Sequence, residues 1–430
     1  MTNKGSFFDR VEMRELSNGS KLAVLANPHA PTATIAGTLH AGPAYAADGR
    51  FAVPGITAAM LDRGTGDYDR LTLARELEDH GLQLLVRASS GTPTIVSFSA
   101  QGLEEELPRM VKLLFEVLRR PTFPQQELDK FREQVLGSLV RERQETNARA
   151  FAALSRRVYP DGHPLLRRPI EVREQEVSTI TREDLTSFHE STYGPRSLTI
   201  AVVGQVDGSE VASIIDTHMS GWDGDPAEMI TLPAGDPPPP SEERIQIADR
   251  PNLDVYLGHR GNLLRGADDY AAAILANSCL GQSTLTSRLG VEVRDHQGLT
   301  YGIYSRFFGT LHVPGLWAVA LGVSADNLDR AVAASRDVIT QYVGEGPTEA
   351  ELDDERMALS GAYRVGLATN SGVARELVTA LTAGEGVERL DRFPEELLEV
   401  SRDQVMAAIS QHFHPEQLVL TAAGDFGDGG

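Results

Sequence analysis

Two stretches of the sequence resemble each other at a constant spacing of 220 residues. Residues 181–185 match residues 401–405, and four single positions follow at the same spacing: Tyr193 with Phe413, Pro195 with Pro415, Leu198 with Leu418, and Gly204 with Gly424. Residues 127–129 match residues 351–353 at a spacing of 224. A fixed spacing between similar stretches is the signature of a duplicated unit, here of roughly 210 residues. We therefore expect two tandem homologous domains.

A proline-rich segment separates the two copies. Residues 237–240 are four consecutive prolines, which favour an extended spacer and which neither a helix nor a central strand accommodates. The sequence thus predicts an N-terminal domain over residues 1–228, a linker over residues 229–244 and a C-terminal domain over residues 245–430.

Each copy has the pattern of strands followed by helices. Residues 11–26 form two alternating runs joined by Asn18 and Gly19, which is a strong hairpin signal. A third strand is expected over residues 32–39. The other expected elements of the first copy are helices over residues 53–63, 71–80, 104–119 and 182–193 and strands over residues 82–88, 94–99 and 197–204. This order predicts an α+β fold in which an antiparallel sheet packs against helices.

Composition narrows the class of partner. The net charge of −21 argues against nucleic acid or a membrane surface and favours basic peptides or a basic partner protein. We find no apolar run of membrane-spanning length and no signal-peptide core in the first ten residues, so we expect a cytoplasmic protein, or a periplasmic one if a signal was trimmed. The single cysteine, Cys279, excludes an intrachain disulfide, and its apolar neighbours predict buried packing.

The stretch over residues 287–304 joins a helix to a strand around one glycine. Its first part predicts a helix that ends near His296, and Gly298 predicts a tight turn. The aromatic, alternating residues that follow predict a strand from about Leu299.

Such a short turn would place Arg294 and Tyr301 side by side. The guanidinium fork can donate to a carbonyl and the phenol can donate to an oxyanion, so the pair suits a peptide substrate. The alternative interpretation is a solvated helix arginine and a half-buried packing tyrosine.

Residues 277–289 together with residues 293–301 closely resemble the second-domain signature of the pitrilysin (insulinase, M16B-like) family of zinc peptidases. In that family an arginine and a tyrosine seven residues later reach the zinc site of the first domain. The resemblance implies that Arg294 and Tyr301 bind the substrate carbonyl and stabilise the tetrahedral intermediate. It also implies the two-domain fold expected from the repeat.

The zinc motif of the family is degenerate in this chain. Metal-binding members carry His-x-x-Glu-His, two ligands and a general base, on the helix that here ends before Gly64. Aligned from that glycine, the ligand positions are Gly55 and Ala59 and the base position is Ala58. The third ligand position falls at Ser138. None of these residues can bind zinc, so we expect no metal or other cofactor on this chain.

Other candidate ligands are weaker. Glu133 lies near the third ligand position, but a lone glutamate would not hold zinc. Glu76 and His80 are one helical turn apart, which is typical of a solvated helix face.

The remaining histidines have no ligand set around them in the sequence. His412 and His414 form a loop pair that is usually on the surface. His163, in a His-Pro loop, has no second donor nearby and is expected to be structural.

The sequence therefore predicts a zinc-lacking subunit of a two-chain metalloendopeptidase. Arg294 and Tyr301 would complete the site of a homologous partner that carries His-x-x-Glu-His and zinc, and the pair would cleave peptides. Two alternatives remain: an inactive structural subunit, like the relatives that serve as scaffold subunits of respiratory complexes, and a peptide-binding module without catalytic role.

Overall fold

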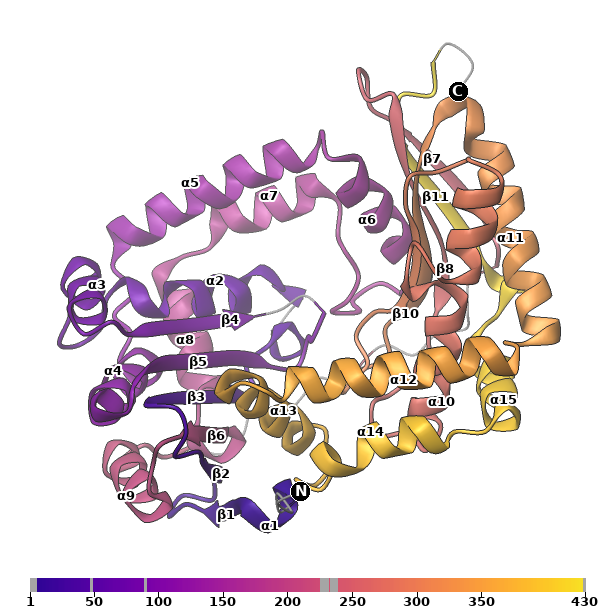
Figure 1. The fold of residues 1–430 in the computed structure, drawn as a ribbon. Coiled ribbons are helices and arrows are strands. Elements are labelled where there is room, and N and C mark those ends of the chain that lie inside the picture. The colour runs from indigo at the N-terminus through magenta and orange to yellow at the C-terminus, as the bar shows by residue number, and fades with distance from the viewer. Residues whose placement is uncertain (1–5, 47–48, 89–90, 225–231, 233–238, 428–430) are drawn as a thin grey trace. The chain divides into compact units, whose positions relative to one another are not determined.

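The computed structural model describes residues 6–46, 49–88, 91–224, 232 and 239–427 (Figure 1). These residues form two compact units. The first comprises Met1–Val135, Gln175–Thr231 and Ala362–Phe393, and the second comprises Leu136–Glu174, Leu232–Gly361 and Pro394–Gly430.

The first unit is built on a six-stranded sheet in the order β1-β2-β6-β3-β5-β4. Its strands are β1 (Val11–Glu15), β2 (Lys21–Ala26), β3 (Thr32–Leu39), β4 (Gln83–Ala88), β5 (Val96–Leu103) and β6 (Thr199–Gly204). The predicted hairpin is confirmed: β1 pairs with β2, and Gly19 takes the positive φ of +85° that its turn requires. The sheet is not wholly antiparallel as predicted, because β6 returns beside β2 in the parallel direction.

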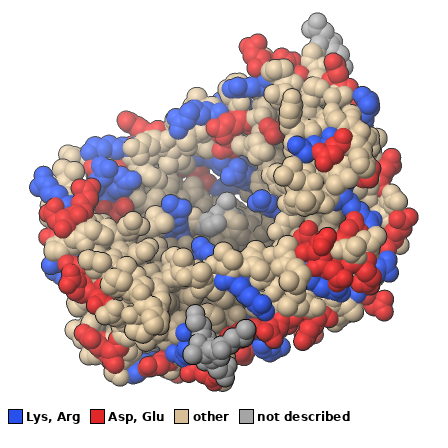
Figure 2. Space-filling view, in the orientation of Figure 1, with Lys and Arg blue, Asp and Glu red and all other residues tan. Residues whose placement is uncertain are grey.

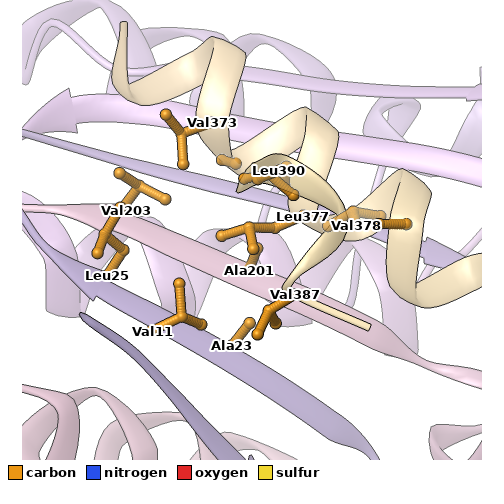
Figure 3. Packing of buried hydrophobic residues seen from close by; sticks show 13 residues of the cluster. Val11, Ala23, Leu25, Ala201, Val203, Val373, Leu377, Val378, Val387 and Leu390 are labelled. Atoms are coloured by element: carbon orange, nitrogen blue, oxygen red, sulfur yellow. The ribbon is translucent and has the colours of Figure 1, made fainter. Parts of the chain in front are cut away.

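Successive side chains along the strands of this sheet point to opposite faces, and those on one face belong to an apolar cluster. The cluster contains Ala23 and Leu25 of β2, Ala201 and Val203 of β6, and a helix, α13 (Asn370–Thr382), whose Val373, Leu377 and Val378 pack onto them (Figure 3). Other helices with residues in this unit include α1 (Phe7–Arg10), α2 (Ala52–Met60), α3 (Arg70–Asp79), α4 (Leu107–Arg119), α7 (Ile170–Thr179), α8 (Arg182–Thr192) and α9 (Gly208–Met219).

The second unit is built on a five-stranded sheet in the order β7-β11-β8-β10-β9. Its strands are β7 (Glu242–Gln246), β8 (Asn252–Arg260), β9 (Ile303–Phe307), β10 (Leu316–Ser324) and β11 (Val419–Gly424). Here too one pair, β7 with β11, is parallel. The helices of this unit include α6 (Thr146–Val158), α10 (Tyr270–Asn277), α11 (Leu328–Glu345) and α15 (Arg402–His412), and α14 (Arg389–Glu399) continues into it from the first unit.

The repeat predicted from the sequence is visible in the elements. Helix α8 and strand β6 recur as α15 and β11 at the spacing of 220, and both helices begin with a capping box. Helices α5 (Gln125–Glu142) and α6 recur as α12 (Glu349–Gly366) and α13 at the spacing of 224, with identical lengths. The fold class is confirmed as α+β with two similar sheet-and-helix units.

The compact units are nevertheless not the contiguous halves predicted from the sequence. Helix α6 precedes the linker in the chain but packs on β8 and β11 of the second sheet, and α13 follows it but packs on β3 and β6 of the first. A sequence repeat reports which segments are related, whereas a compact unit depends on which apolar faces pack together. The boundaries 1–228 and 245–430 therefore remain a prediction of where the two duplicated segments lie in the sequence, and they do not describe the compact units.

The predicted linker over residues 229–244 is too long at its C-terminal end, because residues 242–244 already belong to β7. Residues 229–231 and 233–238, which include the first two of the four prolines, lie outside the described residues.

Two properties expected from the composition, the surface charge and the lack of a membrane-spanning segment, can be compared with the structure. In Figure 2 acidic and basic side chains are interspersed over the face in view, so the net charge of −21 is not gathered there in one patch. Within the described part of the chain, no helix is both long and apolar enough to cross a membrane.

Candidate functional site

Arg294 lies on a π-helical turn, Gly290–His296, that is held in place by buried neighbours. Leu289 and Val293 are fully buried and fix the inner side of the turn. Gly290 packs against the backbone of Thr284, where an added Cβ would come within 2.2 Å of the carbonyl oxygen. π-Helical turns are rare and often occur at functional sites. This one carries Arg294 in its last turn.

The chain then reverses at Gly298, as predicted. Gly298 has a positive φ of +62°, and its amide donates to the Arg294 carbonyl at 3.1 Å. The next residue, Leu299, is buried and its amide donates to the Val293 carbonyl at 3.1 Å. The predicted helix end near His296 is confirmed. The predicted strand start at about Leu299 is wrong, because the ladder to β10 begins only at Ile303.

The turn brings Arg294 to the backbone of Tyr301. The Arg294 Nε donates to the Tyr301 carbonyl oxygen at 3.1 Å, and an amino group of the same guanidinium pairs with the Asp295 carboxylate. The Tyr301 side chain is 97% exposed. The alternative interpretation of Tyr301 as half-buried packing is therefore wrong for this chain, since almost none of the ring contacts it.

A shallow depression of about 690 Å³ lies beside this pair. It is lined by the turn itself, by the end of β10 and by two asparagines: Asn252, Arg294, Asp295, Gly298, Leu299, Thr300, Tyr301, Gly322, Val323, Ser324 and Asn327. Guanidinium, amide and hydroxyl donors around a concave surface suit the polar backbone of an extended peptide.

The degenerate zinc positions lie on helices, as the sequence predicts. Gly55, Ala58 and Ala59 are on α2, and an added Cβ at Gly55 would meet nothing within 4 Å. Ser138 is on α5, in the other compact unit, and is exposed. These side chains offer no imidazole or carboxylate, so they do not fit zinc. Among the described residues, no group of three or more His, Cys, Asp or Glu side chains could hold a metal ion.

Two family models match successive parts of the chain. The model described as Insulinase (Peptidase family M16) matches residues 21–166, and the model described as Peptidase M16 inactive domain matches residues 179–359. The chain belongs to peptidase family M16. Its α2, without ligands, lies in the first match, and its Arg294 and Tyr301 lie in the second.

Relatives within family M16 include peptidase subunits and zinc proteases. The chain is 24% identical over 448 residues to a mitochondrial-processing peptidase subunit beta of Lentinula edodes, covering 99% of this chain and 91% of that protein. It is 29% identical over 261 residues to an uncharacterized zinc protease of Mycobacterium leprae, a match that spans 58% of this chain and only 56% of the relative.

Solved structures show the same fold. A peptidase M16 inactive domain from Pseudomonas fluorescens superposes with a TM-score of 0.88 at 25% identity, covering 97% of this chain and 98% of that one. A protease from Helicobacter pylori superposes with a TM-score of 0.83 at 16% identity, covering 96% and 99%.

The other candidate ligands do not belong to a metal site among the described residues. Glu76 and His80 do not form a site: the Glu76 carboxylate accepts from Arg109 at 3.0 Å, and His80 Nδ1 lies 3.0 Å from the Glu106 carboxylate. Glu133 is exposed on α5.

Two buried groups behave as predicted. His163 is buried, stacks on Tyr159 at 4.6 Å, and burial lowers its pKa to about 4. Cys279 is also buried, and burial raises the pKa of its thiol to about 12, which makes it a poor nucleophile.

The prediction that His412 is a surface residue is wrong. It ends α15, is 2% exposed, and lies between the Asn262 side-chain oxygen at 2.5 Å and the Asp269 carboxylate at 2.8 Å. His414, half-buried, lies 3.5 Å from the Glu416 carboxylate. Asn262 and Asp269 are about 150 residues away in sequence, and no local pattern points to such a contact.

One residue of the site was not singled out from the sequence. Thr300, between Arg294 and Tyr301, is almost buried, and its hydroxyl bonds to strand β10. Its partner, the Gly322 carbonyl, is 22 residues further along the chain, so the sequence carried no signal for the contact.

Proposed function

We propose that this chain is the zinc-lacking subunit of a heteromeric metalloendopeptidase. In this proposal Arg294 and Tyr301 act at the zinc site of a homologous partner subunit that carries His-x-x-Glu-His. The observation that carries it is the contrast within one chain: α2 has lost every metal-binding side chain, whereas Tyr301 stands 97% exposed beside Arg294.

The exposure of Tyr301 supports a role toward another molecule. A tyrosine buries a large apolar area when it packs, and an almost fully exposed ring forgoes that gain within its own chain. Its hydroxyl is therefore available to donate to an oxyanion that develops on a bound peptide. A scaffold subunit has no comparable use for this side chain.

Arg294 would bind the carbonyl of the same peptide. Its Nε already donates to the Tyr301 backbone, which leaves amino groups to donate outward while the guanidinium stays fixed in orientation. The exposed Asp295 carboxylate shares one amino group. Exposed ion pairs of this kind are weak, and we expect a substrate carbonyl to compete with it.

Two alternatives rest on the same loss of ligands at α2. An inactive scaffold subunit and a peptide-binding module would both tolerate Gly55, Ala58 and Ala59. The similarity to a subunit of mitochondrial-processing peptidase supports assembly with another chain. Both the proposed catalytic role and the scaffold alternative include such assembly, so this similarity does not distinguish them. The kinetic test separates the catalytic role from both alternatives.

The test is turnover by this chain assembled with its metal-bearing homologue. Tyr301→Phe removes one hydroxyl, and we expect kcat to fall roughly 10²–10³-fold, as for the loss of one oxyanion donor. Arg294→Lys keeps the charge but loses the Nε bond and the fork, so it should fail as well, with more of the loss in KM.

Two neighbouring substitutions serve as controls. Tyr304→Phe removes a half-buried hydroxyl on β9, and Arg306→Lys changes an exposed arginine on the same strand. Both should leave turnover per assembled complex close to that of the unmodified protein. Unchanged kcat in both Tyr301→Phe and Arg294→Lys would rule out the catalytic role and leave the two non-catalytic alternatives.

A further inference from the structure

We infer that Thr300 is a positioning residue that holds the Tyr301 backbone, and hence the point from which its phenol extends, in the place used for catalysis. This inference rests on the proposed function, because it assigns Thr300 a part in the work of Tyr301.

The Thr300 hydroxyl joins the turn to the neighbouring strand. Its Oγ1 lies 2.6 Å from the Gly322 carbonyl oxygen on β10 and 2.9 Å from the Gly302 carbonyl oxygen, and it accepts from the Gly302 amide at 3.1 Å. A hydroxyl has one proton to donate, and the shorter distance favours Gly322 as its acceptor. Thr300 is 9% exposed, so water competes little for these bonds.

These bonds act on a segment that little else restrains. The β9–β10 ladder begins at Ile303, so residues 300–302 lie outside it. Among the described residues, the other hydrogen bonds to this segment include the Arg294 bond to the Tyr301 carbonyl and one long bond, 3.3 Å, from the Gly322 amide to the Gly302 carbonyl. Gly302 itself has wide conformational freedom.

Because Tyr301 is exposed, the placement of its side chain depends on the backbone more than on packing. A packed ring is oriented by its neighbours, but the Tyr301 ring is 97% exposed and has almost none. The position and direction of its Cα–Cβ bond therefore depend on the backbone dihedral angles of residues 300–302, and only rotation about the side-chain bonds is left to the ring. A displacement of about 1 Å in a catalytic group can cost up to a hundredfold in rate, so a hydroxyl that fixes this backbone should affect turnover.

The role does not require Thr300 for folding. Leu299, 3% exposed, anchors the turn in the core, and Gly298 supplies the reversal. Thr300→Val keeps the shape and removes the hydroxyl, whereas Thr300→Ser keeps the hydroxyl. We expect Thr300→Val to lower kcat in the assembled enzyme roughly tenfold with little change in KM, and Thr300→Ser to stay near the unmodified value.

A double-mutant cycle with Tyr301→Phe tests whether Thr300 acts through the phenol. We expect Thr300→Val to reduce kcat with Tyr301 present and to have almost no further effect in the Tyr301→Phe background. Equal losses in both backgrounds, or no loss with Tyr301 present, would overturn the inference while leaving the proposed function standing. If Tyr301→Phe alone leaves kcat unchanged, the proposed function fails and this inference with it.

Two further measurements distinguish a loss of positioning from a general loss of stability. Ser305→Ala removes a buried hydroxyl on β9, which donates to Asn277 at 2.9 Å, and should lower Tm while turnover per assembled complex stays normal. If Thr300→Val does not assemble, Thr300→Ala removes the same hydroxyl and enters the same cycle. In the isolated chain, amide exchange at Gly302 should accelerate in either variant and recover in Thr300→Ser; unchanged exchange would overturn the inference.

Discussion

At the scale of single residues, we expect one buried histidine, His259, to make the stability of the protein depend on pH. His259 is 1% exposed and stacks on Trp317 at 5.3 Å. Its Nδ1 lies 2.9 Å from the Arg260 carbonyl, to which it donates, and its Nε2 accepts from the His414 amide at 3.3 Å. The ring must therefore be neutral, and burial lowers its pKa from 6.5 to about 4.

We expect stability to fall as the pH falls from about 6.5 to about 4. In this window the unfolded chain binds a proton at His259 that the folded chain does not, so the folded state loses about 1.4 kcal/mol per pH unit, or about 3 kcal/mol in all. Denaturant unfolding at several pH values should show a shallower slope in His259→Gln than in the unmodified chain.

The exposed His29 provides the matched control for this prediction. His29→Gln should keep the pH slope of the unmodified protein. An unchanged slope in His259→Gln would show that His259 does not titrate in this way.

The sequence predicted that Arg294 and Tyr301 lie on one turn, but not that Tyr301 is exposed or that Thr300 belongs to the site. The spacing of Arg294 and Tyr301 around Gly298 sufficed to place them on one turn, because the turn is local. The exposure of Tyr301, the hydroxyl bond of Thr300 to Gly322 and the burial of His412 depend on strands and helices distant in sequence. Local patterns carry no information on such contacts.

At the scale of elements, the equivalent helices α8 and α15 begin with the same capping motif, which is built from different residues in the two copies. Thr181 caps α8 and Ser401 caps α15, each in a reciprocal capping box, with Asp184 and Gln404 respectively. The side-chain oxygen satisfies an amide at the helix start that has no partner within the helix.

We expect Ser401→Ala to lower the free energy of unfolding by about 1 kcal/mol, because it removes the side-chain cap of α15. Ser401→Thr should stay close to the unmodified protein, since threonine fills the same place in the first copy. Denaturant unfolding measures both. Equal stabilities for the alanine and threonine variants would contradict a capping role.

Many elements of the first copy could be predicted from the sequence, but the exchange of helices between the two compact units could not. Strand β3 has the predicted bounds, and α3 and β4 differ by one residue. These follow from local periodicity. The packing of α13 on the first sheet and of α6 on the second depends on apolar faces brought together over more than 100 residues, which the repeat does not report.

At the scale of the whole molecule, the proposed function requires a stable complex with a zinc-bearing homologue. Duplicated chains of one family tend to associate through pseudo-twofold symmetry. We expect light scattering of an equimolar mixture at micromolar concentration to give a species with the summed mass of the two chains. Separate monomers across that concentration range would contradict the pairing.

Zinc content and peptide hydrolysis, measured together on each purified chain and on the mixture, test the division of labour most directly. Because Gly55, Ala58, Ala59 and Ser138 offer no ligands, we expect this chain alone to hold no stoichiometric zinc and to cleave no quenched peptide. The mixture should hold about one zinc per pair and show chelator-sensitive cleavage. Zinc bound tightly by this chain alone, or chelator-sensitive cleavage without the partner, would contradict the account.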